Sequence, residues 1–119
     1  SWRAAGTSPG SRFVSWIFLL PWLSLMKGMM RRAGVRYNDF LFGMNDSGTM
    51  TLDLALRLVR NLPEGVTELC FHPASARCAE IDGTMPRYMH EEELRALTSD
   101  ALARELRTTG IRTIAFSDL

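Results

Sequence analysis

The sequence predicts an α/β fold that is built from parallel β/α units. Short apolar runs bounded by turn residues are typical of strands, and the amphipathic segments between them are typical of helices. Along the chain these segments alternate as strand, helix, strand, helix, strand. A crossover helix returns the chain to the same edge of a sheet, so this order favours parallel strands. With 119 residues, the chain has the length of one domain.

Composition excludes several other classes of protein. Hydrophobic residues make up 46% and charged residues 23% of the chain, which excludes a disordered tail and a collagen-like repeat. The formal net charge of +1 provides no field that would attract nucleic acid. Two cysteines, Cys70 and Cys78, predict reduced thiols in a cytoplasmic protein. Together with His72 and His90 they match no standard spacing of zinc ligands.

The first predicted element is an apolar, basic helix over residues 11–34. Gly34 is well placed just after its last turn, and Pro21 predicts a kink within it. Residues 1–38 carry six basic side chains and no acidic one, whereas residues 39–119 have a net charge of −5. Such asymmetry is typical of chains whose basic end contacts a membrane or a polyanion.

Three interpretations of the apolar run at residues 13–26 stay open. It is 14 residues long, and a membrane-spanning helix needs roughly 20. It fits a buried or half-buried helix of the main fold. It also fits an interfacial helix, in which residues 13–30 contact a membrane surface, because Trp and Phe beside Arg and Lys suit the headgroup region. The third interpretation is a signal segment, although no small-x-small cleavage site follows.

Residues 38–119 are predicted to form the β/α units. Strands are expected at residues 39–42, 66–72 and 111–116. Helices are expected at residues 52–62, 91–97 and 100–109. Residues 73–90 are expected to be a long irregular stretch. The glutamates at 91–93 favour a helix start, where acids meet the positive end of the helix dipole, and Ser99 is expected to cap the last helix.

Polar groups follow each predicted strand, and the carboxyl ends of parallel strands gather at one edge of a sheet. The segments concerned are residues 45–47, 72–73 and 117–118. His72 is the main candidate because it ends an apolar strand, and Glu68 lies four residues earlier on the same strand face. One interpretation is a general acid or base that a nearby carboxylate tunes. The other is a histidine that satisfies a backbone carbonyl in the following loop.

Five short motifs in the second part of the chain carry a family resemblance. They are Asn38–Gly43, Ser47–Thr51, Leu62–Leu69 with His72-Pro73-Ala74, Tyr88–Leu97 and Gly110–Leu119. In combination they resemble the C-terminal region of the YdjC-like carbohydrate deacetylases, over about residues 30–119. Within this family they are most similar to the hopanoid biosynthesis-associated (HpnK) branch. Each motif alone is a weak signal, whereas the combination is specific.

The resemblance implies a (β/α) barrel-like deacetylase fold that is incomplete in this chain. The family removes the acetyl group from an N-acetylated sugar with a divalent metal ion, Mg²⁺ or Zn²⁺, which activates water and polarises the amide carbonyl. Its metal ligands, an Asp and the histidines of an Asp-x-His-x-His pattern, have no counterpart here, so no metal ligand is predicted. The resemblance makes His72 the candidate that protonates the leaving amine and Glu68 the candidate that orients it. Ala74 stands where the wider family has glycine.

Two functional hypotheses follow for residues 1–119, taken as one domain. In the first, the chain is the C-terminal fragment of a deacetylase for an N-acetylated sugar or glycolipid, inactive alone, with Ser1 marking a truncation. In the second, it is a non-catalytic interaction module that lacks the metal site and is membrane-associated through residues 13–30. The expected location is the cytoplasm, with membrane association in the second case. An unpaired sheet edge would favour self-association in either.

Overall fold

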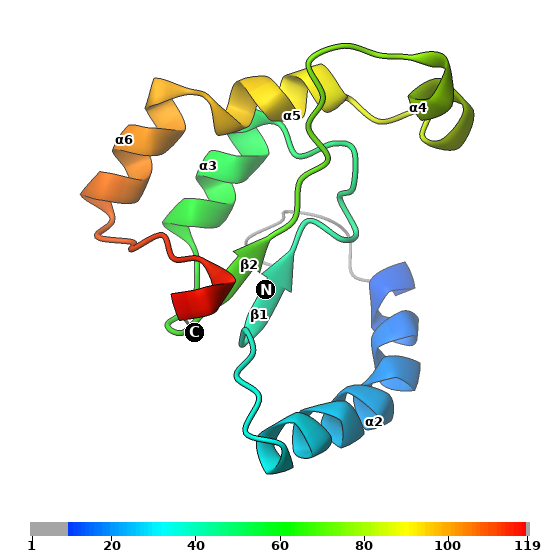
Figure 1. Cartoon of the computed structure of the whole chain (residues 1–119), viewed down its shortest axis with the longest axis vertical. Helices are drawn as coiled ribbons and strands as arrows, with labels where there is room; N and C mark the ends of the chain where they lie inside the picture. The colour runs from blue at the N-terminus through cyan, green and yellow to red at the C-terminus, as the bar shows by residue number, and fades with distance from the viewer. Residues whose placement is uncertain (1–9, 119) are drawn as a thin grey trace.

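A short parallel sheet with helices packed on it forms the centre of the structure, which is a computed structural model (Figure 1). It describes residues 10–118, with side chains described from residue 19 onward. The elements are α2 (Gly10–Arg32), β1 (Phe40–Phe42), α3 (Leu52–Arg60), β2 (Thr67–Leu69), α4 (Ala79–Thr84), α5 (His90–Leu97), α6 (Asp100–Thr108) and the 3₁₀ helix η1 (Phe116–Asp118). The predicted α/β class is therefore confirmed.

Strands β1 and β2 run parallel, as the order of elements predicts, with Phe40 opposite Thr67. Helix α3 makes the crossover between them. Asp39 fixes the start of the pair, because its backbone N–H donates to the Val66 carbonyl at 2.8 Å. Its side chain completes the link, since Oδ2 accepts the Val66 N–H at 2.9 Å. A backbone hydrogen bond and a side-chain hydrogen bond between Asp39 and Val66 thus set the register of the sheet together.

Strand β2 is shorter than the predicted strand at 66–72. The last ladder bond beyond it runs from the Cys70 N–H to the Phe42 carbonyl at 2.9 Å. Two residues later, side chains of α5 bond both backbone polar groups of His72. The ladder therefore stops where side chains replace a neighbouring strand as hydrogen-bond partners.

The predicted strand at residues 111–116 is wrong. Residues 111–115 have no regular structure, and Phe116–Asp118 forms η1. Asp118 accepts the Ala115 N–H through Oδ2 at 2.9 Å and returns its own N–H to the Ala115 carbonyl at 3.0 Å. These local bonds use backbone groups that a third strand would need for pairing, and such side-chain bonds compete with sheet formation.

The stretch at residues 73–90, expected to be irregular, contains the short helix α4. Arg77 organises the rest of this loop from within. Its guanidinium donates to Asp82 Oδ1 at 2.5 Å and to the carbonyls of Tyr88 and Pro86 at 2.7 and 3.1 Å. A guanidinium carries five donors in a fixed fork, so one side chain can close a loop around itself.

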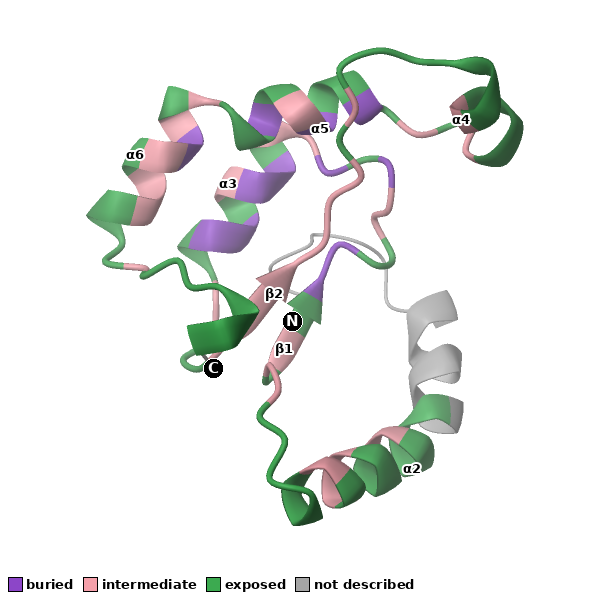
Figure 2. Ribbon diagram, in the orientation of Figure 1, coloured by how far each residue is buried: buried purple, intermediate pink, exposed green. Residues whose placement is uncertain are grey.

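Helix α3 packs between the sheet and the helices α5 and α6, and it carries half of the buried hydrophobic residues in the described part of the chain (Figure 2). Its buried side chains are Leu54, Ala55, Leu58 and Val59. The first core cluster joins this face to Phe42 and Met50, and the second joins it to Leu102 of α6. The spacing of these four residues places them on one face of the helix. This apolar face packs against the sheet and against α6.

Helix α2 lies apart from this core and confirms the helix predicted at residues 11–34 (Figure 1). Gly34 follows its last turn with a φ of +70°, as expected for a glycine that ends a helix. Figure 1 shows α2 bent along its length, and Pro21 inside it removes one backbone donor. The side chains of residues 13–18 lie outside those described. None of the helices in the described part of the chain is long and apolar enough to cross a membrane.

Helix α6 is fixed by a cap at its start and by an ion pair to α3. Ser99 caps it as predicted, since Oγ accepts the Ala101 N–H at 3.1 Å. Farther along, Arg60 Nη2 of α3 donates to Glu105 Oε2 at 2.8 Å. This hydrogen bond holds the pKa of the Glu105 carboxyl below its ordinary value.

The ion pair predicts an acid-sensitive part of the folding free energy. A carboxyl with a lower pKa in the folded state contributes stability above its unfolded pKa, and this is lost as pH falls through the folded pKa. We expect Arg60→Ala to be less stable than the wild type at neutral pH, and we expect this difference to be smaller at about pH 3, below the ordinary glutamate pKa of about 4.3. Urea unfolding at both pH values measures this. Arg57→Ala, an exposed arginine on the same helix, is the control, and an equal pH dependence in both variants would contradict the prediction.

Candidate functional site

His72 lies in the loop just beyond the carboxyl end of β2, beside the start of α5. Its side chain is half-buried. The ring nitrogen Nδ1 is buried and has no hydrogen-bond partner among the described residues. The sequence predicts that His72 ends a strand, whereas β2 ends at Leu69 and His72 lies in the loop that follows. It still lies on the side of the sheet where parallel strands end and functional groups gather.

Glu93 of α5 joins this loop to the loop that precedes α3. Its side chain is 0% exposed, and each carboxylate oxygen accepts one backbone N–H. Oε1 accepts from Met50 at 3.1 Å, and Oε2 accepts from His72 at 2.5 Å. The run of glutamates does form the first turn of α5, as predicted. Glu93 has this further role because a buried carboxylate must find donors inside the protein.

His90 bonds the other backbone group of His72. Its Nδ1 lies 2.5 Å from the His72 carbonyl oxygen. A carbonyl can only accept, so we assign the proton to Nδ1 of His90. The side chain is 3% exposed, and its Nε2 is buried without a partner in the described part of the chain. The role of satisfying a backbone carbonyl, which the sequence left open for His72, thus belongs to His90.

Tyr88 packs against both imidazoles. Its ring meets that of His72 edge-on, with centroids 5.2 Å apart and planes at 75°, and lies 5.6 Å from that of His90. Gly48 lies directly against Tyr88: a Cβ there would be 2.2 Å from Tyr88 Cγ. The carbonyl of Gly48 also accepts the Met89 N–H at 2.7 Å. The residues His72, Tyr88, His90 and Glu93 form what we call the His72 cluster. The loop after β1 therefore reaches this cluster through a glycine.

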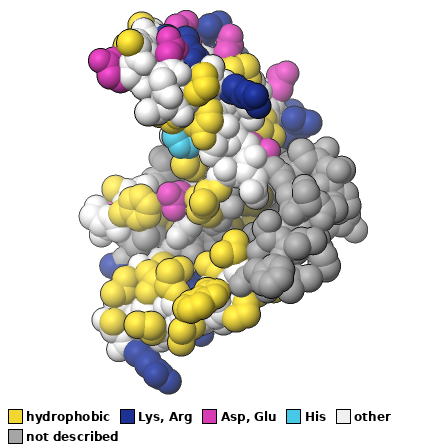
Figure 3. Space-filling view, turned by 90° about the vertical axis from the view of Figure 1, so that its right-hand side faces the viewer, with side chains coloured by type: hydrophobic (Ala, Val, Ile, Leu, Met, Phe, Trp, Pro, Cys, Tyr) yellow, Lys and Arg dark blue, Asp and Glu magenta, His cyan; other side chains and the backbone are white. Residues whose placement is uncertain are grey.

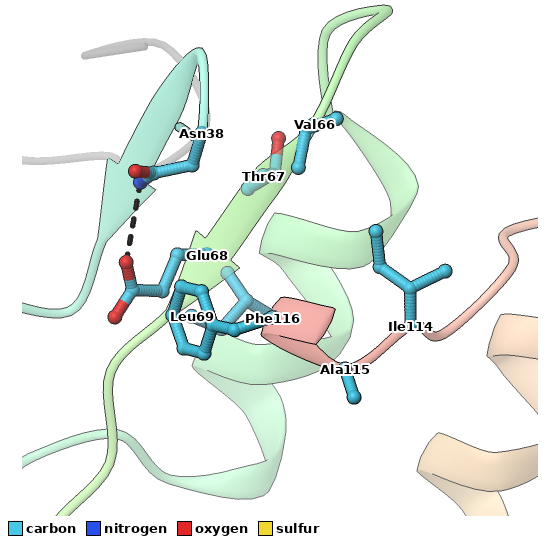
Figure 4. A pocket seen from close by; sticks show the side chains of 8 residues that line it. All are labelled: Asn38, Val66, Thr67, Glu68, Leu69, Ile114, Ala115 and Phe116. Atoms are coloured by element: carbon cyan, nitrogen blue, oxygen red, sulfur yellow. Dashed lines mark hydrogen bonds between the residues drawn. The ribbon is translucent and has the colours of Figure 1, made fainter. Parts of the chain in front are cut away.

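Glu68 lies in a different environment from His72. Its Oε2 accepts a hydrogen bond from Asn38 Nδ2 at 3.2 Å (Figure 4). Asn38 also donates to the Phe40 carbonyl at 3.0 Å. Glu68 and Phe116 line a cavity of about 230 Å³ between β2 and the C-terminal segment. Within residues 10–118 no hydrogen bond joins Glu68 to His72. The structure thus gives the two predicted site residues separate partners.

The predicted edge of three strand ends is formed by two strands only. Residues 114–116 line the cavity along β2, so the C-terminal segment lies beside this strand and not beyond its carboxyl end. In the loop after β1, Ser47 Oγ donates to the carbonyls of Gly43 and Met44 at 3.2 and 2.7 Å. This hydroxyl therefore closes its own turn.

Sequence reasoning missed Glu93 and Tyr88 as parts of this site. A signal for Glu93 exists, because His90, Glu93 and Ala96 form the buried stripe of α5 at helical spacing. A glutamate on such a stripe needs a buried partner. Tyr88 has no comparable signal, because it lies in a loop and its contacts come from distant segments.

The described residues do not form a site for the divalent metal that the resemblance implies. No group of three or more His, Cys, Asp or Glu side chains in residues 19–118 could hold a metal ion. His90 also uses Nδ1 on a backbone carbonyl. We therefore derive no chemical step through a metal from these residues.

Comparison with known proteins decides the family. The model of the family described as YdjC-like protein matches residues 4–108. The chain belongs to the YdjC-like family. The matched region ends with the last residue of α6, so it includes the whole His72 cluster of this YdjC-like chain. No curated protein and no solved structure matches the chain.

The contact between Gly48 and Tyr88 predicts a strong effect of a single methyl group. Gly48→Ala must overcome both a φ of +77° and the overlap with Tyr88. Gly110→Ala is the matched control, because its φ is +70° and nothing lies within 4 Å of an added Cβ. We expect the control to lose about 1 kcal/mol of unfolding free energy from backbone strain. Gly48→Ala should lose about 1–3 kcal/mol more from overpacking.

Urea unfolding of both variants measures the difference. Equal losses in the two variants would show that the Gly48–Tyr88 approach is not a constraint in solution.

Proposed function

We propose that this chain is the C-terminal part of a metal-dependent carbohydrate N-deacetylase. Membership of the YdjC-like family carries this proposal, because the family model matches residues 4–108 of 119. The substrate class is an N-acetylated sugar or glycolipid, whose acetamide is hydrolysed to acetate and a free amine. The resemblance to the HpnK branch supports a hopanoid-linked sugar as the specific substrate.

Hydrolysis of the acetamide needs a group that donates a proton to the amide nitrogen. Hydrolysis adds water to the amide carbonyl, breaks the C–N bond and leaves acetate and an amine. An amine leaves poorly unless its nitrogen gains a proton as the bond breaks, which is the task of a general acid. In the proposal His72 donates this proton. Its place at the carboxyl end of a parallel strand supports the assignment.

Glu68 stays a candidate of the proposed site, with a changed role. Its hydrogen bond to Asn38 leaves it next to the 230 Å³ cavity along β2. A carboxylate and an amide side by side offer both acceptors and donors to sugar hydroxyls. We therefore propose that Glu68 contacts the substrate and does not orient His72.

A second candidate function is a membrane-associated, non-catalytic module. Hydrophobic side chains gather on the face of the molecule that α2 forms (Figure 3). The exposed ones on α2 are Leu19, Leu20, Trp22, Leu25, Met26 and Met29. Lys27, Arg31 and Arg32 lie on the same helix, and apolar residues beside cations suit the surface of an anionic membrane.

The proposed deacetylase is tested with the protein expressed from its complete reading frame. Acetate release from an N-acetylhexosamine in the presence of Mg²⁺ or Zn²⁺ is the measurement. His72→Ala should lower kcat by about 10²–10⁴-fold, the usual contribution of a general acid. Added imidazole should restore part of the activity, whereas it should not affect the wild type. Unchanged acetate release in His72→Ala would remove His72 from the mechanism.

The membrane hypothesis is tested by sedimentation of the 119-residue chain with vesicles. Binding to phosphatidylserine vesicles should exceed binding to phosphatidylcholine vesicles and should weaken with added salt, because the attraction is partly electrostatic. Arg31→Glu with Arg32→Glu should abolish it. A chain that stays monomeric in the supernatant with both vesicle types contradicts this hypothesis.

A further inference from the structure

We propose that His90 and Glu93 are positioning residues for His72, and that Nε2 is the nitrogen of His72 that meets the substrate. This inference rests on the proposed function, since it concerns how the proton donor is held. It adds two residues that the family resemblance does not assign a role. The two act through the backbone of His72 and do not touch the reacting atoms.

The two peptide planes that flank the Cα of His72 are both held by hydrogen bonds. Its N–H belongs to the preceding peptide and is bonded to Glu93 Oε2 at 2.5 Å. Its carbonyl belongs to the following peptide and accepts from His90 Nδ1 at 2.5 Å. Both planes are thus bonded to side chains from a single turn of α5. Pro73 adds a third restraint, because a residue before proline is held in the extended region.

The side chains that make these hydrogen bonds are buried. Glu93 is 0% and His90 is 3% exposed, so water does not compete for either side chain. A hydrogen bond inside a protein, away from water, is electrostatically stronger than the same bond in water. The other oxygen of Glu93 is bonded to Met50, which is itself 0% exposed. One oxygen of Glu93 is therefore bonded to a core residue, while the other oxygen is bonded to His72.

The imidazole of His72 has one buried nitrogen and packs against Tyr88. Nδ1 is buried and without a partner among the described residues, and Tyr88 meets the ring edge-on at 5.2 Å. His72 as a whole is half-buried, and Nε2, unlike Nδ1, is not among the buried side-chain atoms that lack a partner in the described part of the chain. Of the two ring nitrogens, Nε2 is the one that a substrate can approach. Fixed peptide planes and a packed ring hold a donor in one geometry, which is what proton transfer requires.

Two substitutions of His90 separate positioning from simple stability. His90→Phe keeps a planar ring and removes the donor to the His72 carbonyl. His90→Asn keeps an amide N–H in the place of Nδ1–H. Both are made in the protein from its complete reading frame, which is labelled with ¹³C-histidine. The measurements are the kcat and KM of acetate release and the NMR signals of the His72 imidazole.

We expect His90→Phe to lower kcat by up to about a hundredfold, because a small misplacement of a catalytic group has effects of this size. KM should stay within about twofold, since substrate binding is not the affected step. The His72 imidazole signals should shift and broaden. His90→Asn should recover most of kcat and the wild-type signals. Glu93→Gln should reproduce the effect of His90→Phe, with the exposed Glu91→Gln as its control.

Unchanged kcat and unchanged His72 signals in His90→Phe would overturn the inference and leave the deacetylase proposal intact. Equal losses in His90→Phe and His90→Asn, with equal losses in melting temperature, would assign His90 to stability alone and also overturn it. Full acetate release by His72→Ala would instead overturn the proposed role of His72. In that case the inference that His90 and Glu93 position a proton donor would fall with it, whatever the His72 signals of His90→Phe show.

Discussion

The buried carboxylate of Glu93 is the interaction on which the arrangement around the sheet depends. It accepts backbone N–H groups from Met50, which precedes α3, and from His72, which follows β2. Helix α5 thereby holds the connections on both sides of the crossover unit. Loss of the carboxylate would leave the buried Met50 N–H and the partly buried His72 N–H without this acceptor. An unsatisfied buried donor costs about 1–3 kcal/mol. An apolar side chain of similar size would fill the space but could not replace these bonds.

Close packing of backbone against rings adds a second constraint around the same point. Gly48 touches Tyr88 where a Cβ would overlap with its ring, and Tyr88 in turn packs on His72 and His90. The Ser47–Thr51 motif, which contributed to the family resemblance, therefore has a physical reason in this chain. The motif lies in the loop after β1, and this loop packs against Tyr88. Through Tyr88 it approaches His72, which follows β2. Function and packing depend on the same few contacts.

The sequence predicts the parts of this structure that depend on local pattern. Period, turn residues and a cap residue such as Ser99 are enough to place α2, α3, α5, α6 and the parallel pair, but not the short helix α4. The apolar run that leads to His72 is enough to single out that residue, although β2 itself ends at Leu69. The third strand failed because a strand needs a partner, and the local bonds of Asp118 compete with one. Glu93 was missed as a site residue because its partners lie 43 and 21 residues away in the sequence. No local window contains that information.

Hydrogen exchange at the Met50 and His72 amides tests the role of Glu93 most directly. Both amides donate to the same carboxylate, so both should be protected in the wild type. In Glu93→Ala the two protection factors should fall together, whereas Glu91→Ala should change neither. A fall at only one of the two amides, or at neither, would contradict the account that a single buried carboxylate joins the two loops.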